Sequence, residues 1–145
     1  MLGKFLASLS LLGMVLLLSL PVPITATALG SFDWGTIAME YLGLLLLGCA
    51  GLAAGQFISA LSAHQISAFL FGVLFMLVLT MIGRVPAMLV LPTWLVSVLS
   101  WLSLDFHFDS FSKGVLDSRD ALYFIVLAAG FLYFTTKVLL LRRFR

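Results

Sequence analysis

Long, nearly uninterrupted runs of apolar residues constrain this chain more than any other feature of its sequence. They cover about residues 5–29, 36–61, 66–83 and 121–141. Runs of this length leave no room for the polar and apolar alternation of a half-buried strand. Because an α-helix satisfies its own backbone hydrogen bonds in lipid, the runs predict an all-α, polytopic membrane protein with four transmembrane helices.

The composition supports the same class. Hydrophobic residues make up 63% of the chain and charged residues only 10%, whereas a soluble domain carries about 25% charged residues. The eight Lys and Arg residues give a net charge of only +2 and form no long basic run, which disfavours a nucleic-acid partner. The single cysteine, Cys49, cannot form an internal disulfide. We therefore expect one transmembrane domain over residues 1–145, surrounded by the lipid bilayer.

The first apolar run allows two interpretations. Its uninterrupted part ends at Leu20, before two prolines, and has 16 residues, fewer than the roughly 20 of a typical span. Lys4, the leucines that follow and the small residues Ala26-Thr27-Ala28 are also typical of a secretory signal peptide. Membrane proteins commonly keep an uncleaved first span, so we favour a span and leave the cleaved signal open.

Small residues in the second run predict a helix-packing face. Gly51 and Gly55 form a GxxxG pair, and steps of three and four residues add Gly48 and Ser59 to the same side of a helix. Such a stripe lets the backbone of another helix approach closely. Small residues are also common in membrane helices generally, so the pattern does not identify the partner helix.

Residues 84–120 are expected to lie outside the bilayer core. Two prolines interrupt their apolar half and leave a short helix from Thr93 to Leu104. Twelve residues of helix rise about 18 Å, too little for a hydrocarbon core about 30 Å thick. Trp94 and Trp101 favour headgroup depth, so we expect a re-entrant or interfacial helix before the last span.

The polar stretch that follows this helix is expected to be an interfacial loop. Asp105, His107 and Asp109 alternate in it and could in principle offer ligands to a metal ion. A loop in which charged and aromatic residues alternate explains the pattern better, so no metal site is predicted. Asp120, at the end of the stretch, is expected to cap the last span.

Basic residues predict the topology. Arginines follow the last run, at Arg142, Arg143 and Arg145, which favours a cytoplasmic C-terminus. Four spans then place the N-terminus and Lys4 on the same side. A five-span alternative would put Lys4 outside and the prolines within lipid, so we rank it second.

Few polar residues interrupt the runs. Glu40 lies about one turn inside the second run, where an acid is costly and often functional. Exposure at the interface, or an interfacial charge pair with Arg84, explains it more simply. Ser62, His64 and Gln65 belong to the short turn between the second and third runs, which the four-span topology places in the cytoplasm.

No catalytic or cofactor-binding residues are predicted. The sequence has no phosphate-binding loop of the form GxxxxGK followed by Ser or Thr. No Ser or Cys stands in a nucleophile motif, and no His or Asp that could act with a Ser lies within the runs. We expect a protein that is not an enzyme and that takes any energy it needs from another subunit.

Several stretches, taken in order, resemble the C-terminal part of ABC-2 type transporter permeases, particularly those of the gliding-motility type. The resemblance covers nearly the whole chain and depends on the order and spacing of the stretches rather than on any one of them. They are Gly3–Ala7, Asp33–Gly35, Tyr41–Leu45, Phe57–Leu61, His107–Asp117 and Arg119–Phe124.

The resemblance implies the last four spans of a six-span permease subunit of an exporter in the bacterial inner membrane. It implies a cytoplasmic ABC ATPase subunit and a second permease subunit as partners, and it places Ser62, His64 and Gln65 in a loop facing the ATPase. The family's first two spans and its main coupling helix have no counterpart in this sequence, so we expect a fragment or a separate N-terminal permease piece. The alternative is a small structural or assembly subunit of a membrane complex, without transport activity.

Overall fold

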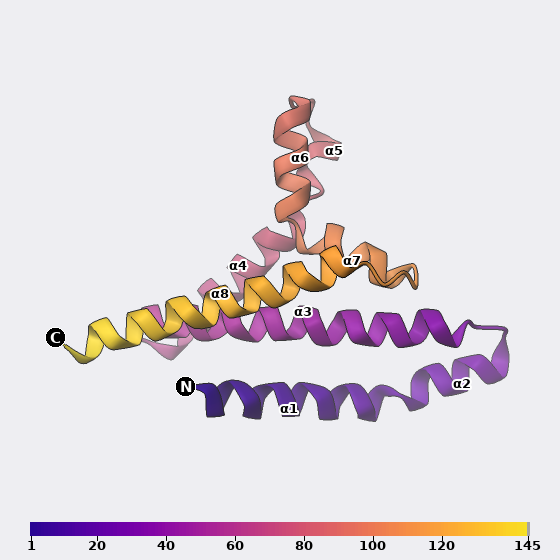
Figure 1. Cartoon of the computed structure of the whole chain (residues 1–145), viewed down its shortest axis with the longest axis horizontal. Helices are drawn as coiled ribbons and strands as arrows, with labels where there is room; N and C mark the ends of the chain where they lie inside the picture. Colours follow the sequence, from indigo (N-terminus) through magenta and orange to yellow (C-terminus); the bar gives the residue numbers. More distant parts are fainter. Residues whose placement is uncertain (145) are drawn as a thin grey trace.

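The computed structural model describes residues 1–144, apart from the side chain of Ala87. These residues form helices, turns and short connections, with no strand among them (Figure 1). The helices are, in order, α1 (Leu2–Ser19), α2 (Pro21–Leu29), α3 (Trp34–Leu61), α4 (Gln65–Met81), α5 (Val85–Met88), α6 (Thr93–Leu102), α7 (Leu104–Ser112) and α8 (Ser118–Arg143).

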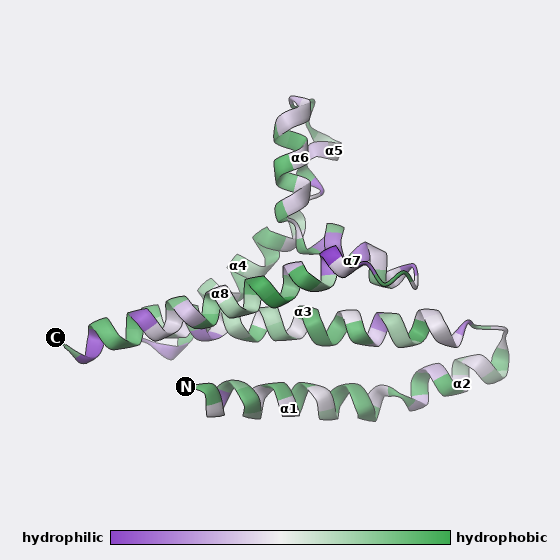
Figure 2. Ribbon diagram, in the orientation of Figure 1, coloured by the Kyte–Doolittle hydropathy of each residue, from purple (hydrophilic) through white to green (hydrophobic). Residues whose placement is uncertain are grey.

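Three helical stretches are long and apolar enough to cross a membrane. They are Leu2–Leu29 and Trp34–Leu61, with 28 residues each, and Ser118–Arg143, with 26 residues. Apolar residues cover most of their length in Figure 2. The all-α fold is thus confirmed, and three helical stretches have the length and composition of membrane spans. α4, which corresponds to the third predicted span, has 17 residues and is shorter than the roughly 20 of a typical span.

The two prolines of the first run do not end its helical stretch. Leu20, between α1 and α2, keeps a helical backbone with φ −54° and ψ −34°. Pro21 is the first residue of α2, where its missing N–H costs little because first-turn N–H groups have no partner within the helix. The stretch from Leu2 to Leu29 is therefore long enough for a span, although the uninterrupted apolar run before Pro21 is short.

α3 lies at the centre of the bundle and runs parallel to α8. Residues further along α3 contact residues further along α8. Ala53 packs with Ala128, the Phe57 ring centroid lies 5.7 Å from that of Phe131, and the Leu61 carbonyl oxygen accepts from the Arg142 side chain. Two fully buried alanines of α3 pack in clusters with residues of α8, Ala50 with Phe124 and Ala53 with Ala128, and small side chains let helix backbones approach closely.

The predicted glycine face of α3 is divided among several neighbours. A Cβ atom added at Gly48 would collide with the Leu12 side chain of α1, and one at Gly51 would lie 3.1 Å from the methyl carbon of a methionine of α4. Gly55 has open space around it, and Ser59 is exposed. A single packing face was expected for these four residues. The arrangement differs because α3 has neighbours on more than one side.

The segment between α4 and α8, residues 82–117, forms a cap at one end of the bundle. α6 projects from the bundle and lies across the direction of α3 and α8 (Figure 1), and it begins at the predicted residue, Thr93, and ends at Leu102. The stretch expected to be a loop instead forms α7. Its Leu104 and Phe111 are buried in the main core with Ala50 and Phe124. This burial stabilises a helix that the polar sequence did not predict.

The opposite end of the bundle, which we call the turn end, contains the turn at residues 62–64 and the last turn of α8. The N-terminal residues lie there too, because Met1 and Lys4 line a small cavity with Ser59 and Leu139. Arg142 joins the last turn of α8 to the last residue of α3. Both chain ends and the turn therefore lie at the end opposite the cap (Figure 1).

Candidate functional site

A buried pair of ionisable side chains joins the cap to α8. His107 of α7 and Asp120 of α8 are 4% and 8% exposed, and the His107 Nδ1 atom lies 2.5 Å from an Asp120 carboxyl oxygen. The Nε2 atom lies 2.8 Å from the backbone carbonyl oxygen of Trp101. A carbonyl oxygen can only accept, so Nε2 carries a hydrogen and donates it.

This geometry fixes the combined charge of the pair. With Nε2 protonated, the contact between Nδ1 and the carboxyl group needs one more proton, which belongs either to the ring or to the carboxyl group. In the first state an imidazolium faces a carboxylate, and in the second a neutral ring faces a neutral acid. The pair has zero net charge in both states, which suits its burial, because unpaired buried charges are strongly disfavoured.

Aromatic rings complete this cluster. The Tyr123 ring stacks on the His107 ring with centroids 3.8 Å apart and planes 19° apart, and its hydroxyl donates to the Leu102 carbonyl oxygen over 2.7 Å. Trp101 lies edge-on to both rings. We call Trp101, His107, Asp120 and Tyr123 the His107 cluster. It ties the end of α6, the middle of α7 and the first turns of α8 together.

The predicted cap of the last span is different in the structure. α8 begins at Ser118, and the Asp117 side chain accepts a hydrogen bond from the backbone N–H of Arg119 over 3.0 Å. Asp117 is thus the N-cap residue, and Asp120 lies within the first turn, where its side chain bonds to His107. The prediction placed the start of the helix three residues too late.

Arg84 has a different partner from the predicted Glu40. Its Nε atom lies 3.0 Å from a carboxylate oxygen of Asp105. This contact forms because α7 is helical and brings Asp105 close to the end of α4. Glu40 is exposed on α3 and belongs to no ion pair within residues 1–144.

The three residues considered as metal ligands face three different partners. Asp105 pairs with Arg84, His107 with Asp120, and Asp109 with Lys113. Residues two apart on a helix do not face each other, so the helix separates side chains that an extended loop could have brought together. In the part of the chain that the structure describes, no three His, Cys, Asp or Glu side chains gather in a way that could hold a metal ion.

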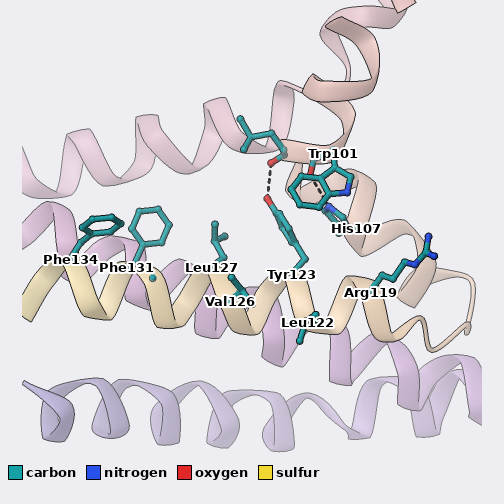
Figure 3. Close-up of a pocket in the computed structure, with 11 residues that line it drawn as sticks. Trp101, His107, Arg119, Leu122, Tyr123, Val126, Leu127, Phe131 and Phe134 are labelled. Atoms are coloured by element: carbon teal, nitrogen blue, oxygen red, sulfur yellow. Dashed lines mark hydrogen bonds between the residues drawn. The ribbon is translucent and has the colours of Figure 1, made fainter. Parts of the chain in front are cut away.

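An open cavity of about 650 Å³ extends from the His107 cluster along α8 (Figure 3). Its polar end contains Trp101, His107, Tyr123 and Arg119. Apolar side chains line the rest of its length as far as the aromatic residues of the middle of α8, and these are Leu122, Val126, Leu127, Phe131 and Phe134. We call this cavity the α8 groove. A polar end joined to an apolar channel is suited to an amphiphilic molecule.

The turn predicted to face an ATPase is small and accessible. Ser62 is the C-cap residue of α3, His64 precedes α4, and Gln65 is the first residue of α4. His64 and Gln65 are exposed, and Ser62 is partly exposed. Their position at the turn end, beside the last turn of α8, makes them available to a partner that approaches this end of the bundle.

Comparison with known proteins gives no match: no protein-family model, curated protein or solved structure matches this chain.

Proposed function

We propose that this chain is a membrane-spanning permease subunit of an ABC-type exporter of the bacterial inner membrane. ATP would be hydrolysed by a separate subunit. The supporting observation is the division of the molecule into span-length apolar helices, a cap before the last of them, and a turn end that gathers both termini and the turn at residues 62–64. The resemblance to ABC-2 type permeases implies this same division.

A fourth crossing by α4 is part of the proposal. α3 and α8 run in the same direction, so the chain must return from the turn end to the cap between them. The 17 residues of α4 rise about 26 Å, close to the hydrocarbon thickness of about 30 Å. Along α8, the stretch from Arg119 to Lys137 rises a similar distance, about 27 Å. Arg119 and Lys137 thus mark the two edges of the apolar layer, and α4 is long enough to reach from one edge to the other.

This topology places the turn end in the cytoplasm and the cap outside. Lys4, Lys137, Arg142 and Arg143 gather at the turn end, as the positive-inside rule favours. Glu40 then lies on the external side, because the next turn of α3 contains Gly43, which packs against Phe111 of the cap. An acid in this position contacts water rather than lipid.

The sides of the bundle support association with further helices. Only Phe5 is buried in α1, and no residue is buried in α4. Lipid or other transmembrane helices must cover these apolar sides. A second permease subunit and a separate N-terminal permease piece are the partners we propose for them, with the ATPase subunit at the turn formed by Ser62, His64 and Gln65.

Affinity purification in mild detergent, followed by mass spectrometry, tests this function. We expect an ABC ATPase subunit to be recovered with the wild-type chain. A variant in which Ser62, His64 and Gln65 are all alanine should recover less of it, because these side chains lie at the proposed contact. A matched variant with alanine at Asp109, Ser112 and Lys113, in the cap, should recover the wild-type amount. Recovery of a membrane complex without any ATPase would contradict the proposal.

A small structural or assembly subunit is the second candidate. The observation that favours it is the shortness of the connection between α3 and α4, where only Ser62, Ala63 and His64 separate the two helices. So short a turn offers little surface for coupling to an ATPase. Under this alternative, purification would recover other membrane subunits, and alanine at the turn would not change the amount recovered.

Cysteine accessibility tests the fourth crossing. In a Cys49→Ser background, which removes the only cysteine, we expect Ser112→Cys to react with a membrane-impermeant maleimide added to intact cells with a permeabilised outer membrane. Ala63→Cys should react only after the inner membrane is broken, because α4 separates the two positions. Both residues are exposed, so equal labelling in intact cells would place them on one side and exclude a crossing by α4.

A further inference from the structure

We infer that the α8 groove binds one anionic phospholipid from the leaflet on the cap side, with its phosphate beside Arg119 and an acyl chain along α8. This inference depends on the chain lying in a membrane, and not on transport activity or on an ATPase partner.

The length and lining of the groove suit an acyl chain. From Arg119 to Phe131, α8 rises about 18 Å. The hydrocarbon layer of one leaflet is about 15 Å thick, so this stretch spans it and reaches into the headgroup layer. At its deep end Phe131 lies edge-on to Phe75 of α4, with centroids 5.8 Å apart. Between these ends Gly130 leaves open space, because a Cβ atom added there would meet nothing within 4 Å.

The charge at the polar end suits a phosphate. Three basic side chains lie in the cap and the first turn of α8, and two of them already have acidic partners, Arg84 with Asp105 and Lys113 with Asp109. The third, Arg119, forms no ion pair with any residue from 1 to 144, and its side chain borders the groove (Figure 3). A guanidinium group binds a phosphate through paired hydrogen bonds.

Two acidic residues lie within two positions of Arg119 in the sequence, Asp117 and Asp120, and neither lines the groove. Asp117 accepts from the backbone N–H of Arg119, and Asp120 forms the neutral pair with His107. The wall of the groove beside the headgroup therefore carries no net charge from the His107 cluster that would repel a phosphate. Trp101 and Tyr123, in the same wall, are the residue types enriched at headgroup depth. Together these features favour an anionic phospholipid over a zwitterionic one.

Quenching of Trp101 fluorescence by brominated lipids tests the inference. Trp34→Phe and Trp94→Phe leave Trp101 as the only tryptophan, and this protein is reconstituted in phosphatidylcholine vesicles. Phosphatidylglycerol brominated on its acyl chains is then added at increasing mole fraction, and brominated phosphatidylcholine serves as the reference. We expect half-maximal quenching at about a fivefold lower mole fraction of the anionic lipid, the factor that one Lys or Arg typically adds at a membrane surface.

Two pairs of variants separate the headgroup from the acyl chain. Arg119→Gln should remove the preference for the anionic lipid, whereas Arg143→Gln, at the turn end, should keep it. Gly130→Leu fills the groove and should remove quenching at low mole fraction, whereas Gly13→Leu, which also enters open space but on α1, should not. All four variants should keep the wild-type circular dichroism spectrum.

Equal quenching by the two lipids in the wild-type protein would overturn the inference. Such quenching would come from the bulk lipid that surrounds any membrane protein and not from a bound lipid. A preference that survives both Arg119→Gln and Gly130→Leu would overturn it as well. Neither result bears on whether an ATPase is recovered with the chain, so the two proposals fail independently.

Discussion

Replacing Asp120 with alanine is expected to lower the free energy of unfolding by about 3–5 kcal/mol, because it removes one partner of the buried, hydrogen-bonded pair of His107 and Asp120. His107 would remain buried with its Nε2 bonded to the Trp101 carbonyl oxygen and its Nδ1 without a partner. The measurement is denaturant-induced unfolding in detergent micelles, followed by tryptophan fluorescence. Asp109→Ala, which breaks an exposed pair with Lys113, should cost only about 0.2–1 kcal/mol.

A double variant sharpens this test. Asp120→Leu with His107→Phe removes both ionisable groups, so no unpaired buried group remains, and it should be more stable than Asp120→Leu alone. The coupling between the two sites follows from the four free energies of unfolding of the mutant cycle. If Asp120→Ala and Asp109→Ala cost the same, or if the two sites show no coupling, the buried contact between His107 and Asp120 does not exist in the membrane-bound protein.

Gly43→Ala is expected to destabilise the protein by about 1–3 kcal/mol through overpacking. The added Cβ atom would lie 2.7 Å from the Cβ and 2.8 Å from the Cγ of Phe111. Phe111 is fully buried in the main core, so it has no free space into which to move. The substitution also raises helix propensity by about 1 kcal/mol, which offsets part of the loss. Thermal unfolding in detergent measures the net effect.

Gly55→Ala is the matched control on the same helix. No atom lies within 4 Å of a Cβ atom added there, so only the propensity gain of up to about 1 kcal/mol applies. We expect the two substitutions to change stability in opposite directions. Equal effects would mean that α3 and α7 do not approach each other at Gly43.

The spans could be predicted because long apolar runs carry their own signal. The run from 36 to 61 became α3, and the one from 121 to 141 became most of α8. The first run was harder to interpret, since Pro21 divides it. The sequence rules for proline do not reveal that the helix resumes at once, which here depends on the helical conformation of Leu20.

The candidate site could not be predicted, because its partners are brought together by tertiary structure. His107 and Asp120 lie 13 residues apart on two different helices. The alternation of charged and aromatic residues suggested an interfacial loop, whereas Phe111 of this stretch enters the core. Because α7 is helical, the side chains of Asp105, His107 and Asp109 point in different directions. The polar residues between 104 and 120 were the only available signal. They indicated that this segment differs from the spans, but not which of its side chains meet.

The parallel pairing of α3 and α8 has a consequence for biogenesis. A ribosome makes α3 early and α8 late, and the intervening residues take several seconds to synthesise at typical rates. During that interval α3 leaves the translocon with its alanine surface uncovered, facing lipid or an insertion chaperone. Assembly of residues 82–117 must also wait, since α7 packs against both α3 and the newly inserted last helix. Folding of this protein in the cell is therefore completed only after its C-terminal helix, α8, has been made.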